Sequence, residues 1–71
     1  MPDSSEANIA TADALTLLLH NQHALGAAIE EVALWAQSIG SPTTHSNAIT
    51  ALEILDKNAS AIAVAIMKLR Q

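Results

Sequence analysis

Two histidines, His20 and His23, come closest in this sequence to a chemical site by residue type and spacing. Residues three apart share a face of a helix, so their imidazoles would offer two metal-ligand nitrogens on one side. Asp56, from the second half of the chain, is the candidate third ligand. The sequence has neither a His-Glu-x-x-His motif nor a Glu-x-x-His pair. We therefore expect two solvated histidines and no metal or other cofactor.

The remaining polar residues do not form a recognisable catalytic set. Glu30 and Glu31 are adjacent, so on a helix they point about 100° apart and cannot work as a general acid and base on one face. The chain has no cysteine nucleophile, no glycine-rich phosphate loop and a single arginine, Arg70. These observations predict a protein that is not an enzyme.

The charge distribution argues against nucleic-acid and membrane partners. The net charge is −4, and the only basic residues besides histidine are Lys57, Lys68 and Arg70, too few and too dispersed to neutralise phosphates. Lys68 and Arg70 are placed to complement the negative end of a helix dipole. Residues 1–6 do not resemble a secretory signal, and the most apolar stretch, 59–67, is far shorter than the roughly 20 residues that span a bilayer. We expect a cytoplasmic protein.

Apolar residues recur at alternating steps of three and four on both sides of Gly40, Ser41 and Pro42. This period is typical of an amphipathic helix, and the break between the two stripes predicts a turn. The expected fold is all-α, a two-helix antiparallel hairpin. The first stripe comprises Leu15, Leu18, Gln22, Leu25, Ile29, Val32, Ala36 and Ile39, and the second comprises Ala48, Leu52, Leu55, Ala59, Ile62, Ile66 and Leu69.

Residues typical of helix starts and ends set the expected boundaries of the two helices. Residues 1–9 lack an apolar period and are predicted to be a flexible tail, with Asn8 or Thr11 capping a first helix over about 10–39. Gly40 suits a left-handed C-terminal position, and Ser41 followed by Pro42 is typical of a helix start. The turn is expected at 40–42 and the second helix at about 43–70, so that residues 10–71 form the hairpin.

A chain of 71 residues without disulfides is near the size at which one core yields only roughly 3–5 kcal/mol. A two-helix layer cannot cover its own apolar faces, so we expect a homodimer that forms a four-helix bundle. A tetramer or a separate protein partner remains open, because Leu17, Leu34, Ile54, Val64 and Met67 project away from the seam. The expected core and interface residues are Leu18, Leu25, Ile29, Val32, Trp35, Leu52, Leu55, Ile62 and Ile66.

Three positions carry alternatives. Trp35 is expected either at the dimer interface or as a lid over Ala48 and Ile49 within one chain. Gln22 should lie near Ala59 and within reach of Asn58, where the amides either form a buried layer that sets the register or are hydrated at the edge. Gly26 leaves room for a close approach of the two helices.

Residues 23–25 and 30–35, with 51–58 after the turn, resemble a group of small, uncharacterised bacterial helical-hairpin proteins. These have a Leu-Trp segment before a glycine turn and an Ala-Leu-Glu segment after it. The resemblance spans roughly residues 20–69 and carries no known activity. The architecture also resembles the RNA-binding hairpin dimers of the Rop type. This chain departs from them because its first helix has no Lys or Arg.

The function that these features predict is a non-enzymatic oligomeric interaction or regulatory module. The alternative is a chaperone-like or antitoxin-like protein that covers a partner protein with Leu17, Ile54 and Val64.

Overall fold

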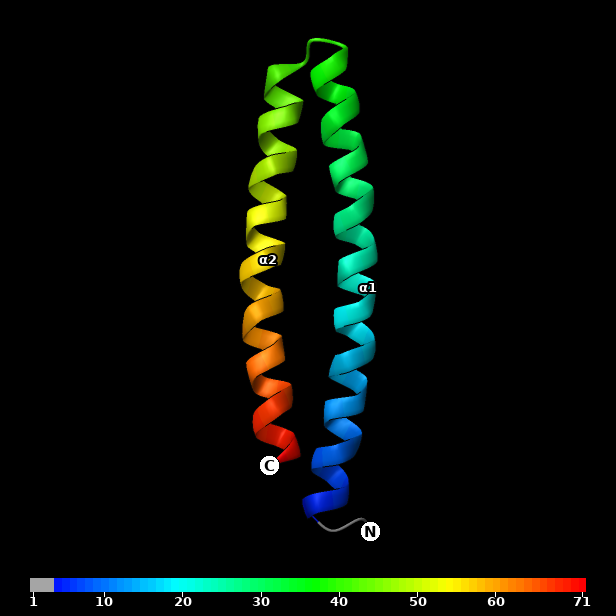
Figure 1. The fold of residues 1–71 in the computed structure, drawn as a ribbon, viewed down its shortest axis with the longest axis vertical. Helices are drawn as coiled ribbons and strands as arrows, with labels where there is room; N and C mark the ends of the chain where they lie inside the picture. Colours follow the sequence, from blue (N-terminus) through cyan, green and yellow to red (C-terminus); the bar gives the residue numbers. More distant parts are fainter. Residues whose placement is uncertain (1–3) are drawn as a thin grey trace.

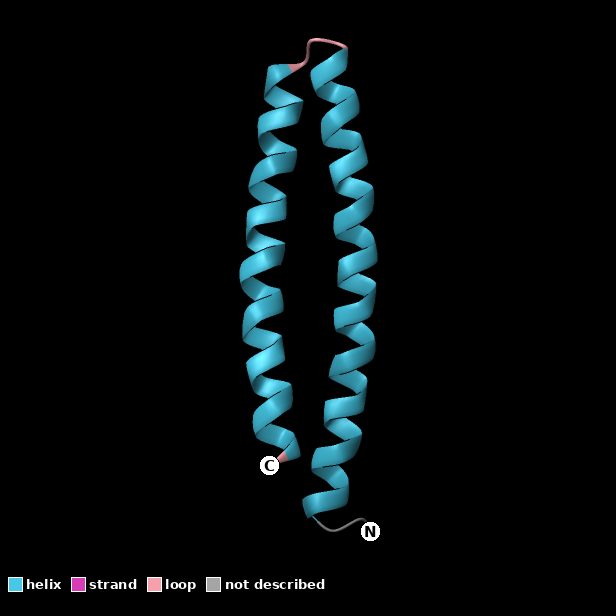
Figure 2. Cartoon of the chain, in the orientation of Figure 1, coloured by secondary structure: helices cyan, strands magenta, loops and turns pink. Residues whose placement is uncertain are grey.

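Two α-helices account for nearly all of residues 4–71, which are the residues described by the computed structural model. Helix α1 is Ser4–Ser38 and helix α2 is Pro42–Arg70, and residues 39–41 connect them (Figures 1 and 2). No strand occurs within this part of the chain. The expected all-α class is confirmed. The helices lie side by side in a rod whose Cα atoms span 55 × 15 × 13 Å.

Helix α1 begins at Ser4, six residues before the expected start near residue 10. Residues 4–9 are therefore helical, and the prediction of a flexible tail is wrong for them. No glycine or proline interrupts this segment, and Glu6 and Ala7 within it favour the helix. Thr11 does not cap a helix, because its Oγ1 donates a hydrogen bond to the Ala7 carbonyl 2.9 Å away. The rest of the predicted tail, residues 1–3, lies outside the described residues.

The end of α1 confirms the role expected for Gly40. This residue has a φ of 73°, a left-handed conformation that glycine adopts without steric cost. The Ser41 amide donates to the Ala36 carbonyl at 2.9 Å, and the Gly40 amide donates to the Gln37 carbonyl at 3.2 Å. These two bonds form a Schellman motif, which satisfies carbonyls left free at the helix end.

The start of α2 follows the expected order of residues but not the expected hydrogen bond. Ser41 occupies the N-cap position and Pro42 the first turn, as predicted. The Ser41 hydroxyl donates to Thr44 Oγ1, 2.9 Å away, and caps no backbone amide. The first turn is instead closed by the His45 amide, which donates to the Ser41 carbonyl at 3.1 Å.

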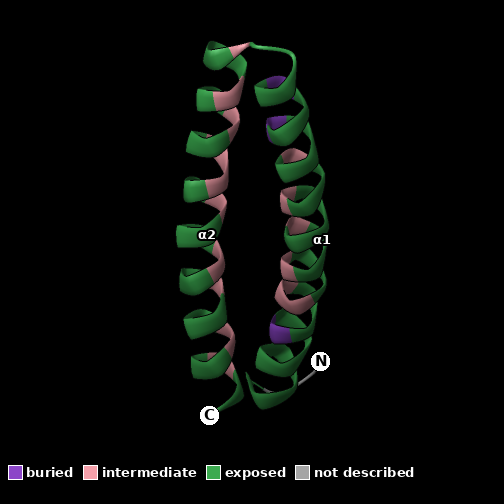
Figure 3. Ribbon diagram, turned by 45° about the horizontal axis from the view of Figure 1, so that its top comes forward, coloured by how far each residue is buried: buried purple, intermediate pink, exposed green. Residues whose placement is uncertain are grey.

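The buried residues and most half-buried residues of each helix face the other helix and form the α1–α2 seam (Figure 3). In α2 the seam contains the whole predicted stripe. In α1 only every second position of the predicted stripe takes part. The α1 side of the seam comprises Ala12, Leu15, Leu19, Gln22, Gly26, Ile29, Ala33 and Ala36, whereas Leu18, Leu25, Val32 and Ile39 are exposed.

Small residues explain which face of α1 contacts α2. Among residues 4–71, the fully buried apolar residues are Ala12, Ala33 and Ala36, at no more than 2% exposure. Short side chains let two helix backbones approach closely, which leucines at the same positions would prevent. At Gly26, an added Cβ would lie 3.9 Å from a Leu55 methyl group and 4.0 Å from a Leu52 methyl group. The seam is therefore closed over the glycine by leucines of α2.

Polar contacts tie the two ends of the helix pair. Near the turn, His45 Nδ1 lies 2.9 Å from the Ala33 carbonyl oxygen. At the other end, an Arg70 guanidinium nitrogen donates to Asp13 Oδ1 at 2.7 Å. The start of α2 thus meets the end of α1, and the end of α2 meets the first part of α1. The ion pair is solvent-exposed, so we assign it at most about 1 kcal/mol.

The two glycines generate opposite predictions for substitution by alanine. Gly26→Ala should raise the free energy of unfolding by about 1 kcal/mol, since the new methyl group meets leucine methyls at ordinary contact distance and the helix propensity improves. Gly40→Ala should lower it by about 1–2 kcal/mol, because a side chain disfavours the left-handed conformation. Urea unfolding followed by circular dichroism, at one fixed protein concentration, measures both. A destabilised Gly26→Ala variant would mean that the helices lie closer at this level than the structure shows.

Candidate functional site

A row of large apolar side chains runs along α1 beside the seam and faces solvent. We call Leu18, Leu25, Val32, Trp35 and Ile39 the α1 stripe. Their exposed fractions lie between 49% for Val32 and 61% for Leu25 and Trp35. Four of them are seven residues apart, so they share one face of the helix, and Trp35 fills the adjacent row. A continuous exposed apolar row of this kind is typical of an interaction surface.

The position of the α1 stripe follows from the choice of seam. Leu18, Leu25 and Val32 each come three residues after a seam residue, so they lie directly beside the seam. Ala14 and Ala28, one turn before Leu18 and Val32, are also exposed and add apolar surface between the larger side chains. The stripe is therefore an extension of the apolar face that the α1–α2 contact leaves uncovered.

The structure divides the residues expected at the core and interface into two groups. Five are half-buried between the helices and four are exposed. Sequence periodicity placed both groups on one face, whereas the structure separates an internal contact from an external surface. The half-buried group is Ile29, Leu52, Leu55, Ile62 and Ile66, and the exposed group is Leu18, Leu25, Val32 and Trp35.

Trp35 does not cover the turn end of α2. The expectation of a lid over Ala48 and Ile49 is wrong, because 61% of Trp35 is exposed within the single chain. The indole is the largest side chain of the α1 stripe. A large aromatic residue exposed beside apolar neighbours is the type of residue that anchors protein interfaces.

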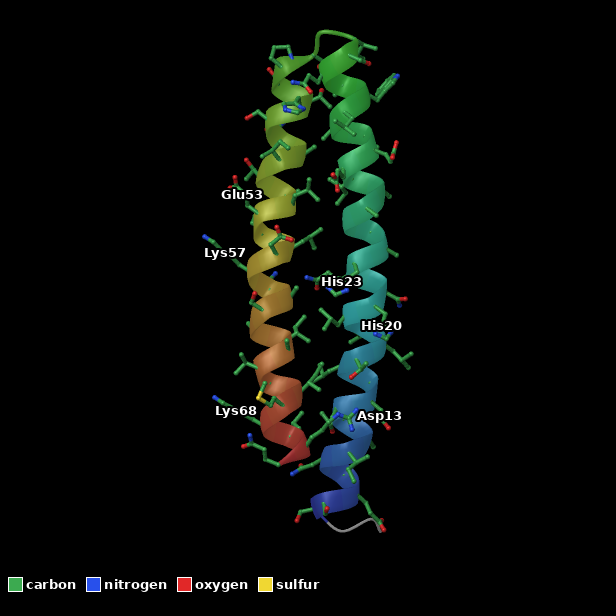
Figure 4. The ribbon with its side chains drawn as sticks, in the orientation of Figure 1. Asp13, His20, His23, Glu53, Lys57 and Lys68 are labelled. Carbon is green, nitrogen blue, oxygen red and sulfur yellow. The ribbon has the colours of Figure 1, made fainter. Side chains whose placement is uncertain are left out.

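The opposite side of the helix pair carries polar residues around Gly26. His23 and Glu30 of α1 and Asp56 of α2 line a groove of about 450 Å³ whose floor includes Gly26. Figure 4 shows His20 about one turn from His23 along α1, and both are exposed. Within residues 4–71, no group of three or more His, Asp or Glu side chains is arranged to hold a metal ion. The structure therefore does not assemble the His20, His23 and Asp56 set.

Gln22 is half-buried in the middle of the seam and crosses it. Its Nε2 donates to the Leu55 carbonyl oxygen at 2.7 Å. Asn58 is exposed, so the proposed amide layer of Gln22 and Asn58 does not form within one chain. The amide that crosses the seam binds backbone instead of a second amide, because the close helix approach brings the α2 backbone within its reach.

His45 is the polar contact residue that sequence reasoning missed. Since a carbonyl oxygen only accepts, His45 Nδ1 donates the bond to Ala33. A signal was present in the sequence, because His45 precedes Ala48 and Leu52 at steps of three and four and therefore continues the α2 stripe toward the turn. His45 is half-buried, in contrast to His20 and His23.

Several large apolar residues outside the α1 stripe also face solvent. The prediction that they project away from the seam is confirmed. They are Leu17, Leu34, Ile54, Val64 and Met67, with exposed fractions from 49% to 66%. In the described part of the chain, neither helix contains a stretch apolar and long enough to span a membrane.

Comparisons of this chain with protein-family models, with curated proteins and with solved structures find no match. The resemblance to small bacterial helical-hairpin proteins therefore stays a prediction.

Gln22 provides a test of how the seam keeps its register. Gln22→Leu should raise the melting temperature, since leucine adds apolar contact and the Leu55 carbonyl keeps its helical hydrogen bond. The same change should give a mixture of molecular species in place of one, because a single polar seam position favours one register of the two helices. Thermal circular dichroism and size-exclusion chromatography with light scattering measure the two effects. Gln37→Leu, an exposed amide of the same helix, is the control, and one unchanged species for Gln22→Leu would reject the register role.

Proposed function

We propose that this chain is a non-enzymatic interaction module, an antiparallel helical hairpin that dimerises through the α1 stripe into a four-helix bundle. In this proposal the two helices of each copy hold each other through the small-residue seam. The large apolar residues that the seam leaves outside form the contact between copies. The dimer, and not the single hairpin, is then the folded unit.

The observation that carries this proposal is the surface area of the isolated chain. It exposes 5198 Å², whereas a compact monomer of 7.4 kDa would expose about 4200 Å². The excess of about 1000 Å² per chain compares with the roughly 800 Å² that each partner buries in a standard interface. Covering the α1 stripe with a second copy would bring the chain to the surface area of an ordinary small protein.

The composition of the core supports the same conclusion. The buried core of residues 4–71 consists of three alanines, while twelve large apolar side chains are exposed. Full burial of a large aliphatic side chain contributes about 1.5–3 kcal/mol, whereas the large aliphatic residues of the seam are only half-buried within one chain. Helices in folded proteins gain most of their stability from packing of an apolar face. A single hairpin therefore lacks the packing that stable helices of this length require.

A separate protein partner is the second candidate function. It is favoured by the exposure of Leu17, Ile54 and Val64, which lie outside the α1 stripe. A chaperone-like or antitoxin-like hairpin would use these residues to cover apolar surface of another protein. The self-association proposal and this alternative differ in whether the purified chain alone is a defined dimer.

Leu25 and Leu34 form a matched pair for the test. Both are exposed leucines of α1, at 61% and 56%, but only Leu25 belongs to the α1 stripe. Leu25→Gln removes two buried leucines per dimer, so the dissociation constant should rise by about 100-fold or more, at tenfold per 1.4 kcal/mol. Leu34→Gln should leave it nearly unchanged. Sedimentation equilibrium of the purified chain measures both constants, and a wild-type monomer that unfolds cooperatively at high concentration would contradict the proposal.

Trp35 reports on the same contact through its fluorescence, because it is the only tryptophan in the chain. At concentrations that favour the dimer, its emission should lie at shorter wavelength and be less accessible to acrylamide than after dilution to monomer. The reason is that the exposed indole moves from water into an apolar interface. An emission maximum that does not change through dissociation would remove Trp35 from the interface.

A further inference from the structure

The arrangement of the two copies follows from the residues beside the seam. We propose that α1 of each hairpin packs against α2 of the other copy, with both turns at the same end of the dimer. This inference rests on the proposed self-association and adds which helix each α1 stripe contacts.

The residues that lie on one side of the hairpin come from equivalent positions in both helices. The two antiparallel helices of one hairpin are related by a twofold axis perpendicular to the plane that contains them. Residues at equivalent positions, such as those three after a seam residue, therefore lie on the same side of this plane in both helices. The groove on the other side supports this assignment, since His23, Glu30 and Asp56 each come four residues after a seam residue and line it together. The α1 row is Leu18, Leu25, Val32 and Ile39, and the matching α2 row is Thr44, Ala51, Asn58 and Ala65.

These two rows differ in size. The α1 row contains only large aliphatic residues, and the α2 row contains nothing larger than asparagine. The distance between packed helices depends on the side chains at the contact, about 8–10 Å. Large residues packed against small ones give two equal contacts between the copies. Packing α1 against α1 and α2 against α2 would give one wide and one narrow contact, and the hairpins would splay.

Charge favours the same pairing. Helix α1 carries the acids Glu6, Asp13, Glu30 and Glu31 and no Lys or Arg, a formal charge of −4. Helix α2 carries two acids, Glu53 and Asp56, and three bases, a formal charge of +1. Lys57 and Lys68 extend from the side of α2 away from its own α1 (Figure 4). Pairing α1 with α1 would bring two acidic helices together, whereas pairing α1 with α2 brings opposite charges together.

Twofold symmetry connects this pairing to the position of the turns. Two hairpins that meet face to face can be related by a twofold axis that lies between them. This axis runs either along the helices or across the helices, in the direction that joins α1 to α2. The axis along the helices puts α1 on α2 of the second copy and both turns at one end. The axis across the helices puts α1 on α1 and the turns at opposite ends. The position of the turns therefore reports which helices are in contact.

Spin labels measure this position directly, because the chain has no cysteine of its own. Thr43→Cys places a label beside the turn, and Lys57→Cys places a control label near the middle of α2, both at exposed positions. With the turns at one end, the two Thr43 labels are separated only by the width of the bundle. With the turns at opposite ends, each label lies about 21 Å from the centre along the helix, which adds an axial offset of about 42 Å. Double electron–electron resonance on each labelled dimer gives both distances.

Short distances at both positions support the proposal. A distance beyond about 40 Å at Thr43 together with a short distance at Lys57 overturns this arrangement and leaves the dimer intact. The absence of dipolar coupling at both positions, with a monomeric mass by light scattering for the unlabelled chain, overturns the proposed self-association as well. Circular dichroism of each labelled variant establishes that the helices are intact.

Discussion

The close contact of α1 and α2 through small residues is the constraint on which the rest of this structure depends. Alanines at positions 12, 33 and 36 are buried, and Gly26 lies under leucine methyls of α2. Because short side chains occupy these positions of α1, the large residues Leu18, Leu25 and Val32 lie beside the seam and face solvent. The α1 stripe is thus a direct consequence of how the two helices meet, and the same packing rule produces both the internal seam and the external surface.

A pair of helices whose fully buried residues are three alanines, and whose larger seam residues are only half-buried, has little buried apolar area of its own. The polar contacts that Gln22, His45 and Arg70 make are spread from the middle of the pair to its two ends. They align the helices along their length but contribute little net stability, since each replaces a hydrogen bond with water. In the proposed function, association with a second apolar surface supplies the stability that these contacts do not.

Sequence periodicity predicted every large apolar residue on the α2 side of the seam, but not His45, which continues the same row toward the turn. It predicted only half of the α1 side. In α1 the apolar residues occupy more than two of the seven heptad positions. A spacing of three and four therefore fits a row that includes Leu18 and Leu25 as well as a row that includes Leu19 and Gly26. The prediction chose the larger residues, whereas the structure buries the smaller ones. Hydrophobicity favours burial of leucine over glycine. A close contact between two helices favours the smaller residue, because a short side chain lets the helices approach.

The sequence by itself determined the helical class, the turn at Gly40 and the apolar row of the α2 seam, because local propensity and periodicity act within a few residues along the chain. The tertiary structure alone decided that α1 begins at Ser4, that His45 and Gln22 bind backbone carbonyls of the opposite helix, and that Trp35 faces solvent. These last contacts depend on the rotation of each helix about its own axis. That rotation is fixed only when α1 and α2 pack against each other, because the small side chains of the seam decide which faces approach closely.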